Sequence, residues 1–384
     1  MKTVTLFQPQ KIVFGAGTFG QLPDECREKG FRRILALYAS PLKSKAEELQ
    51  QALTQTQIDT LPVEYAIGEP TVSYFNTLLV IAEQHQPDAI IGIGGGSVLD
   101  AAKLMAALHN NGQDHQKSKI KNQKTGDVFG KNLLQGRDCA LIGVPTTSGT
   151  GSEVSPNAIL LDENAFEKKG VISPYLVPDS CYIDPELMIG LPPKITAETA
   201  MDALSHCIEA FTNKFSHPVV DHYALAGIRL IVENLEKAYR DGSNLEARTA
   251  LALGSMYGGL CLGPVNTAAV HALSYGLGGK YHIAHGLANA ILLPEVMQFN
   301  KDVCPEKYEV MAQIIGVRTA DEGVEKIRVL SANCGIPQKL TDIGIGASEI
   351  ENLADLAMKV TRLLVNNPRH VNREDVITIF NALM

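Results

Sequence analysis

Hydrophobic runs in the first half of the chain alternate between short apolar stretches and longer amphipathic ones. The short runs predict strands, and the longer runs, with apolar residues three or four positions apart, predict helices. The predicted strands are Lys11–Phe14, Arg33–Tyr38, Pro62–Ala66, Asp88–Ile93 and Ala140–Val144, and the predicted helices are Gln21–Lys29, Ser44–Thr54, Val72–His85 and Ser97–Leu108. This alternation indicates a parallel sheet covered on both faces. Ligands of such sheets bind beyond the carboxyl ends of the strands.

The pattern changes after Asp184, and the pair Pro192 and Pro193 marks a boundary. Beyond it the sequence predicts helices alone. These are Thr199–Thr212, Pro218–Arg240, Leu245–Leu262, Ala268–Leu277 and several more up to Met384. We therefore expect an α/β domain over residues 1–190 and an all-α helical domain over residues 191–384, with the active site in the cleft between them. A polar stretch, Asn110–Gly136, interrupts the first domain as a long excursion.

Composition restricts the class of protein further. Hydrophobic residues make up 45% and charged residues 20% of the 384 residues, as in a globular protein with a large core. The formal net charge of −8 argues against a nucleic-acid partner. No signal peptide and no apolar run long enough to span a membrane are apparent. Seven scattered cysteines without a C-x-x-C pattern fit reduced thiols, and so a cytoplasmic location.

The stretch from Ala200 to His285 carries the strongest chemical signal. Asp202 and His206 are four residues apart within an apolar helical run, so both side chains lie on the same side of a helix. A buried carboxylate needs a partner, because an unpaired buried charge is costly. A divalent metal ion would be one such partner, and a simple Asp–His hydrogen bond is the alternative.

Two more histidines, His271 and His285, can complete a metal site. His271 lies in a small-residue helical run, and His285 comes fourteen residues later. Gly278 and Gly279 are expected to end the first helix, so that the two imidazoles converge from a helix and from the loop after it. One carboxylate and three imidazoles then make a four-ligand site that suits Fe²⁺ or Zn²⁺.

Two motifs in the first half have the chemistry of a dinucleotide site. In GIGGGSVLDAAK, Gly94, Gly95 and Gly96 follow a strand and open a helix, where backbone N–H groups can approach a pyrophosphate. Ser97 and Asp100 have the spacing of a capping box. The alternative is a tight turn that binds nothing.

The second motif is PTTSGTGSEVSPNA, residues 145–158, which begins at the carboxyl end of another predicted strand. Thr146, Thr147, Ser148 and Thr150 offer hydroxyl and N–H donors to ribose, phosphate or amide groups. A plain Ser/Thr/Gly loop is the alternative for this segment.

Together and in this order, the GGGS turn, the PTTSGTGSE loop, the D-x-x-x-H helix and the H-(13 residues)-HG segment resemble the group III, iron-containing alcohol dehydrogenases. The resemblance covers essentially the whole chain. It implies a Rossmann-like NAD(P)-binding domain and a helical domain with Asp202, His206, His271 and His285 as ligands of Fe²⁺ or Zn²⁺. It further implies that the metal would bind the oxygen of a small alcohol or aldehyde substrate and that hydride would pass between the substrate carbon and the nicotinamide. Family members are commonly homo-oligomers, dimers or larger.

The same resemblance implies which residues contact the cofactor. They are Gly94, Gly95, Gly96, Ser97 and Asp100 at the pyrophosphate, Thr146, Thr147 and Thr150 elsewhere on the dinucleotide, Asn157 and Ile159 at the nicotinamide end, and Lys168 at a ribose hydroxyl. Ala39 takes the position where NAD-selective members have an aspartate that repels a 2′-phosphate. We therefore expect NADP(H) to be tolerated or even preferred over NAD(H).

Reduction of an aldehyde also requires a proton. Many family members have a histidine four residues after the third ligand, but this chain has Tyr275 there. His282 lies three residues before His285 and is the expected relay, because imidazole is the side chain most often used to transfer protons, with Tyr275 as the second candidate. The alternative role for His282 is a structural hydrogen bond that holds the loop of His285.

Three other interpretations stay open at this point. Zinc-dependent glycerol dehydrogenases share the architecture and a similar metal site, although the GGGS, PTTSGTGSE and HGLANA motifs favour the iron branch. A dehydroquinate-synthase-like lyase would need several basic side chains near the metal, where the sequence offers only Lys280. A metal-binding protein without catalysis would not need a complete cofactor loop.

Overall fold

The computed structural model describes residues 3–66, 68–109, 123–165 and 167–384. The chain divides into two compact units. The α/β unit comprises Phe7–Thr147 and Ser152–Leu187, and the helical unit comprises Met1–Leu6, Ser148–Gly151 and Met188–Met384. The helical unit thus begins close to the expected boundary at residue 191 and also includes two short segments from the expected first domain. Much of the predicted excursion Asn110–Gly136 lies outside the described residues, and the cleft between the domains stays a prediction.

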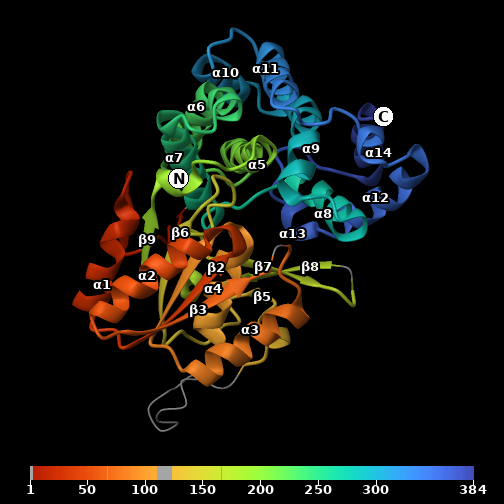
Figure 1. The fold of residues 1–384 in the computed structure, drawn as a ribbon. Coiled ribbons are helices and arrows are strands. Elements are labelled where there is room, and N and C mark those ends of the chain that lie inside the picture. The colour runs from red at the N-terminus through yellow and green to blue at the C-terminus, as the bar shows by residue number, and fades with distance from the viewer. Residues whose placement is uncertain (1–2, 67, 110–122, 166) are drawn as a thin grey trace. The chain divides into compact units, whose positions relative to one another are not determined.

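The α/β unit is built on a six-stranded sheet in the order β1-β9-β6-β4-β2-β3, in which every neighbouring pair is parallel (Figure 1). Its strands are β1 (Lys11–Phe14), β2 (Arg33–Ala39), β3 (Asp59–Tyr65), β4 (Ala89–Gly94), β6 (Ala140–Pro145) and β9 (Ser180–Ile183). The predicted parallel sheet is therefore confirmed. Strand β9 was not predicted, because its sequence SCYI has only three apolar residues, too few to show a period.

Helices cover both faces of this sheet, as the side chains of β2 show. Leu35 and Leu37 of β2 pack with α3 (Val72–His85) and α4 (Gly96–Leu108) on one face. Ile34 and Tyr38, which alternate with them, pack on the other face with α1 (Leu22–Glu28) and α2 (Lys43–Gln55). A strand buried on both faces is apolar throughout, which is why the run RILALY indicated a strand. The four helices agree with the predicted ranges to within one residue at each end.

A second sheet of three strands, in the order β5-β8-β7, was not predicted. Its strands are β5 (Gly130–Lys131), β7 (Asn157–Asp162) and β8 (Glu167–Ile172), and β7 and β8 are antiparallel. Only β7 has an apolar run, and β8 contains Lys168 and Lys169, so hydrophobic pattern could not identify the pair.

The helical unit contains α5 to α14, as the sequence predicts. These are α5 (Pro193–Thr212), α6 (Pro218–Arg240), α7 (Leu245–Leu262), α8 (Ala269–Tyr281), α9 (His285–Asn300), α10 (Pro305–Ile314), α11 (Ala320–Asn333), α12 (Ile350–Met358), α13 (Thr361–Leu364) and α14 (Arg373–Ala382). Helix α5 starts at Pro193, earlier than expected, because proline at the first helical position loses no hydrogen bond.

The expectation that Gly278 and Gly279 end a helix is wrong. Helix α8 continues through both glycines to Tyr281 and ends at His282, whose φ of 55° is left-handed. Both glycines are buried within the helix, although glycine costs roughly 1 kcal/mol inside a helix. His285 is accordingly the first residue of α9 and not part of a loop.

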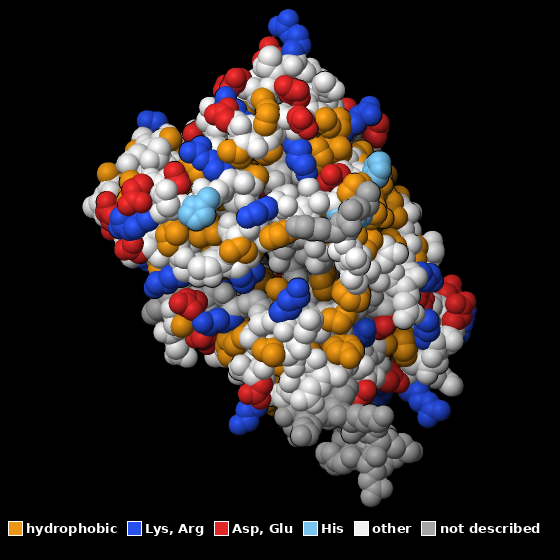
Figure 2. Space-filling model, turned by 180° about the vertical axis from the view of Figure 1, so that it is seen from behind, with side chains coloured by type: hydrophobic (Ala, Val, Ile, Leu, Met, Phe, Trp, Pro, Cys, Tyr) orange, Lys and Arg blue, Asp and Glu red, His pale blue; other side chains and the backbone are white. Residues whose placement is uncertain are grey.

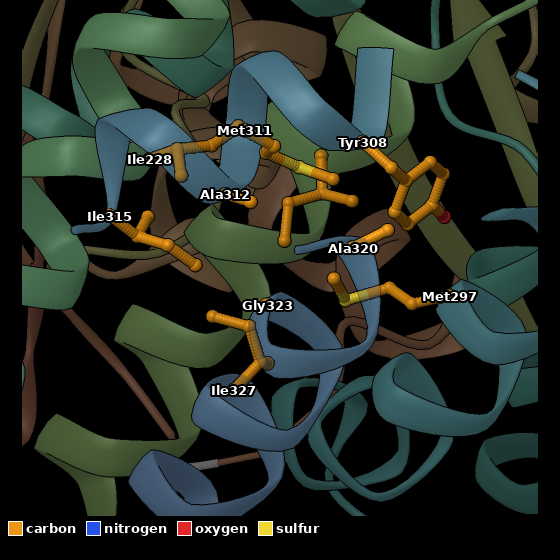
Figure 3. Close-up of a pocket in the computed structure, with 10 residues that line it drawn as sticks. Ile228, Met297, Tyr308, Met311, Ala312, Ile315, Ala320, Gly323 and Ile327 are labelled. Atoms are coloured by element: carbon orange, nitrogen blue, oxygen red, sulfur yellow. The ribbon is translucent and has the colours of Figure 1, made fainter. Parts of the chain in front are cut away.

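Figure 3 shows a small gap in the core of the helical unit, with a volume of about 10 Å³. Its lining comes from Ile208 of α5, Ile228 of α6, Met297 of α9 and residues of α10 and α11. The lining is almost wholly apolar, and the volume is barely enough for one water molecule. We interpret this gap as a packing defect and not as a substrate site.

The surface mixes the two signs of charge. On the face drawn in Figure 2, basic side chains lie among acidic ones and do not form a continuous stripe. Among the described residues, no helix is both long enough and apolar enough to cross a membrane.

The segment Ser148–Gly151 packs tightly against two helices of its unit. Gly151 has a φ of 60°, and a Cβ built on it would lie 2.3 Å from the Cα of Gly259 in α7. A Cβ at Gly149 would lie 2.8 Å from the Cβ of Thr199 in α5. Both glycines of the SGTG sequence are therefore needed for the packing of this loop on α5 and α7.

We predict that Gly151→Ala lowers the free energy of unfolding by about 1–3 kcal/mol, because the new methyl group collides with backbone and the conformation is strained. Gly346→Ala is the matched control in the same unit, since Gly346 has a φ of −91° and open space around its Cβ position. Thermal and denaturant unfolding of both variants would test this. Equal stability of the two variants would contradict the packing argument.

Candidate metal centre and cofactor motifs

Asp202 lies at the centre of a cluster of three histidines, of which His206 and His271 are buried and His285 is half-buried. Its Oδ1 is 3.5 Å from Nε2 of His271, 3.7 Å from Nε2 of His285 and 3.8 Å from Nε2 of His206. His206 lies one turn after Asp202 on α5, His271 lies in the first turn of α8, and His285 begins α9. Three helices thus bring the four predicted ligands together.

The donor set suits a divalent metal ion. One oxygen of Asp202 and one nitrogen each of His271 and His285 all lie within 4.8 Å of one another. His206 is outside this group of three, but its ring stacks on that of His271, with the centroids 4.8 Å apart and the planes 20° from parallel. A carboxylate oxygen with imidazole nitrogens is a donor set that iron and zinc both accept.

The charges of the cluster are strongly coupled. Burial by itself would raise the pKa of Asp202, but the imidazoles of His206, His285 and His271 outweigh it and hold that pKa well below its usual range. Burial lowers the pKa of His206. Burial also disfavours the charged form of His271, yet the carboxylates of Glu209 and Asp202 raise its pKa to about 9. The cluster therefore keeps a carboxylate ionised in the interior, which is the form that binds a cation.

Glu209 orients one of the ligands, and the sequence analysis did not identify it. Its Oε2 lies 2.5 Å from Nδ1 of His271, and its Oε1 accepts a hydrogen bond of 2.6 Å from the backbone N–H of Val270. The Nδ1 proton of His271 is thereby fixed, and Nε2 is left to face Asp202. The sequence spacing could have identified Glu209, because it lies three residues after His206 and so on the same face of α5.

Asn289 is the second residue of the cluster that sequence reasoning missed. It lies one turn after His285 on α9, and its Nδ2 donates a hydrogen bond of 2.7 Å to Oδ1 of Asp202. The i, i+4 spacing of His285 and Asn289 repeats the spacing of Asp202 and His206.

Gly286 explains why α9 can begin next to α5. A Cβ at Gly286 would lie 2.3 Å from the backbone oxygen of Glu198, one turn before Asp202. Any larger residue after His285 would push the start of α9 away from α5 and carry the His285 imidazole away from Asp202.

The two candidate proton relays lie in different surroundings. The Tyr275 ring faces His285, with 6.4 Å between the centroids, and its hydroxyl accepts a hydrogen bond of 2.7 Å from Nη2 of Arg362. His282 is exposed at the end of α8. Within the described part of the chain, no hydrogen bond or ring contact joins the His282 side chain to a predicted ligand.

The two cofactor motifs meet at one edge of the parallel sheet. Gly94 ends β4, Pro145 ends the neighbouring strand β6, and the backbone N–H of Thr146 donates to the Gly94 oxygen at 3.0 Å. A Cβ at Gly95 would lie 3.2 Å from Oγ1 of Thr147. Ala39 ends β2, the other neighbour of β4. These positions share the carboxyl edge, where ligands of parallel sheets bind.

The capping box predicted from Ser97 and Asp100 is wrong. Helix α4 starts at Gly96, its N-cap is Gly95, and no side chain caps it. Asp100 is instead half-buried, where its Oδ1 accepts from Oγ of Ser152 at 2.5 Å and its Oδ2 accepts from the backbone N–H of Ile159 at 2.9 Å. The helix N-terminus thus keeps its backbone donors uncapped by side chains, which is the condition for binding an anion.

The remaining predicted cofactor residues lie on other segments. Asn157 and Ile159 are in β7, and Thr150 lies in the loop of the helical unit. The carbonyl oxygens of Ser155 and Asn157 accept from Nζ of Lys103 in α4, at 2.9 and 2.8 Å. Lys168 lies in β8, and its ammonium group forms an ion pair with Glu69.

Comparison with known families matches the whole two-part organisation. Residues 9–185 match the model described as "Iron-containing alcohol dehydrogenase", and residues 196–384 match "Fe-containing alcohol dehydrogenase family, C-terminal". Long-chain-alcohol dehydrogenase 1 of Geobacillus thermodenitrificans is 34% identical over 391 residues, which cover 98% of this chain and 95% of that protein. Alcohol dehydrogenase 4 of Saccharomyces cerevisiae is 31% identical, with 99% and 98% covered.

Solved structures agree with these relatives. The crystal structure of a 1,3-propanediol oxidoreductase superimposes with a TM-score of 0.91 at 30% identity, and all of both chains is covered. An alcohol dehydrogenase from Oenococcus oeni gives a TM-score of 0.92 at 27% identity, again over all of both chains.

Fold and relatives together define a nicotinamide-linked oxidoreductase that acts on CH–OH groups. The chain belongs to the iron-containing alcohol dehydrogenase family. It interconverts alcohols and aldehydes by metal-dependent hydride transfer.

We predict that Glu209→Gln weakens metal binding by about ten- to a hundredfold, as is usual when a residue that orients a ligand is changed. Glutamine keeps the size of the side chain but loses the charge that holds the Nδ1 proton of His271. Competition with a chelator would measure the affinity for Zn²⁺. Glu246→Gln, at the start of α7, is the control that removes a carboxylate elsewhere in the same unit. Equal affinities for the two variants would contradict the role assigned to Glu209.

Proposed function

We propose that Asp202, His206, His271 and His285 bind Fe²⁺, with Zn²⁺ as a functional substitute. The observation that carries this proposal is the convergence of three imidazoles on one oxygen of Asp202, at 3.5–3.8 Å. When bound, such an ion supplies the Lewis acidity that polarises a substrate oxygen, while the nicotinamide supplies or accepts hydride.

The side chains of this unit perform the supporting steps. Glu209 holds the tautomer of His271, and the N–H of Asn289 holds the carboxylate of Asp202. Tyr275 faces His285 from α8 while its oxygen accepts from Arg362. Because that oxygen already accepts one hydrogen bond, the phenol proton is free to be donated to a product oxygen nearby.

The cofactor edge supports a dinucleotide with either ribose. We propose that Gly94–Gly96, Ser97, Thr146, Thr147 and Thr150 contact the phosphates and riboses, that Asn157 and Ile159 reach the nicotinamide end, and that Lys168 reaches a ribose. Ala39 ends β2 without the carboxylate that would repel a 2′-phosphate, so both NADH and NADPH are accepted. Asp100 acts through Ser152 and Ile159, whose positions it fixes, rather than by direct contact.

We propose short, unbranched aldehydes and alcohols as substrates. Relatives of similar length are named for 1,3-propanediol, methanol and long-chain alcohols, so one architecture accepts a range of chain lengths. We further propose a homodimer, on the resemblance to the family, and a cytoplasmic location, in keeping with seven free cysteines.

A single set of assays tests the proposal. Protein stripped of metal and reloaded with Fe²⁺ or Zn²⁺ should reduce a panel of short aldehydes with NADH and with NADPH. His206→Ala should lose both bound metal and turnover while keeping the circular dichroism spectrum, because the helix stays buried without that ligand. His222→Ala, an exposed histidine on α6, should change neither. Unaltered metal content in His206→Ala would overturn the ligand assignment, and activity with NADH alone would overturn the cofactor assignment.

We predict that Tyr275→Phe lowers turnover by at least tenfold and flattens the pH–rate profile while metal content is kept, because it removes a proton donor next to His285. His282→Ala, the variant that the sequence favoured, should leave turnover within about twofold, since its side chain is exposed. Steady-state rates across pH 6–10 would separate the two. A loss of turnover in His282→Ala alone would instead identify His282 as the proton relay.

A further inference from the structure

Asn289 lies in the middle of the predicted ligand group and not beside it. Its Nδ2 is 2.7 Å from Oδ1 of Asp202, 3.1 Å from Nε2 of His271 and 3.2 Å from Nε2 of His285. These are three of the four atoms that the proposed function assigns to the metal. The side chain is wholly buried, with 0% of its surface exposed.

The amide oxygen of Asn289 is in the opposite situation. Oδ1 is buried and has no hydrogen-bond partner among the described residues. A buried carbonyl oxygen without a partner is unfavourable, and such groups are rare in native proteins. In the same side chain, therefore, the donor end has a surplus of acceptors and the acceptor end has none.

This arrangement and a bound ion exclude each other. An amide nitrogen has two hydrogens, so it cannot donate to all three ligand atoms at once. An ion bonded to those atoms at the usual ~2.0–2.2 Å would occupy the space into which the amide hydrogens point. The N–H end of Asn289 must then turn away, and rotation about the last side-chain bond exchanges it for the oxygen.

We propose that Asn289 is a further residue of the metal centre and that its amide reverses when the ion binds. Before the ion arrives, Nδ2 donates to Asp202 and lies within 3.2 Å of the facing nitrogens of His271 and His285. Reversal then turns the unpartnered Oδ1 toward the cation, either as a direct ligand or through a water molecule. The proposal rests on the proposed function, because it requires the four-ligand site to bind a metal.

Two substitutions of nearly equal size distinguish reversal from simple hydrogen bonding. Asn289→Leu removes both polar ends and should weaken Zn²⁺ and Co²⁺ binding by about ten- to a hundredfold. Asn289→Asp keeps an oxygen and adds a negative charge, so it should bind both ions at least as tightly as the wild type. If Asn289 served only as an N–H donor to Asp202, the same change would place two carboxylates together and weaken binding.

The measurements are the affinity of the stripped protein for Zn²⁺, by competition with a chelator, and the visible absorption of the Co²⁺-loaded protein. The Co²⁺ spectrum of Asn289→Leu should differ from that of the wild type, because the oxygen near the ion is lost. Wild-type affinity and spectrum in Asn289→Leu would overturn the proposal, and so would weakened binding in Asn289→Asp.

Asn300→Leu is the matched control, because Asn300 is also buried in this unit but pairs with Asn367 at 2.9 and 2.8 Å. It should keep the wild-type metal affinity even if its melting temperature falls. Circular dichroism of each stripped variant reports whether it is folded. Failure of the proposed function would look different, because the wild type would bind no metal or His206→Ala would bind as the wild type does.

Discussion

The helical unit depends on finding partners for two of the carboxylates that are buried along one helix. Asp202 and Glu209 of α5 are only 2% and 3% exposed. A buried charge left without a partner destabilises a protein by several kcal/mol, so neighbouring helices must bring donors to both. Helix α8 supplies His271, which lies between the two carboxylates, and α9 supplies His285 and Asn289. The geometry of the metal centre is thus also a condition of helix packing.

The α/β unit also has charged side chains inside it, but there they hold a loop in place and do not form a metal centre. Asp100 and Lys103 lie one turn apart on α4, where Asp100 is half-buried and Lys103 is buried, and each holds part of the second cofactor motif or the residue that follows it. Burial lowers the pKa of Lys103 to about 8 even though Asp100 and Glu153 oppose the shift. The two parts of the GGGSVLDAAK motif therefore have different roles. The glycine turn lies at the carboxyl edge of the sheet, where ligands bind, and the polar side chains of the following helix hold the second cofactor motif in place.

The features that could be predicted from the sequence are those that produce a periodic hydrophobic pattern or a recognisable motif. The five strands with strong apolar runs, the helical second half and the four clustered ligands were all accessible in this way. Strands β5, β7, β8 and β9 were missed because they are short or carry charged residues. Whether the helix ends at Gly278 and Gly279 or continues through them depends on tertiary packing, which local helix propensity does not describe. Glu209 and Asn289 lie at helical spacing from predicted ligands in the sequence. Their roles nevertheless depend on which helices pack together, and only the three-dimensional structure shows that.

The loop Ser148–Gly151 has a consequence for the order in which the chain can become structured during synthesis. This tetrapeptide follows Thr147 directly, but its packing partners are Thr199 and Gly259, about 50 and 110 residues further on. When only the first 187 residues have left the ribosome, the cofactor loop has therefore been synthesised but the residues against which its end packs have not. A fragment ending there would present an incomplete loop, and the helical region could not be exchanged for another by a single cut in the gene.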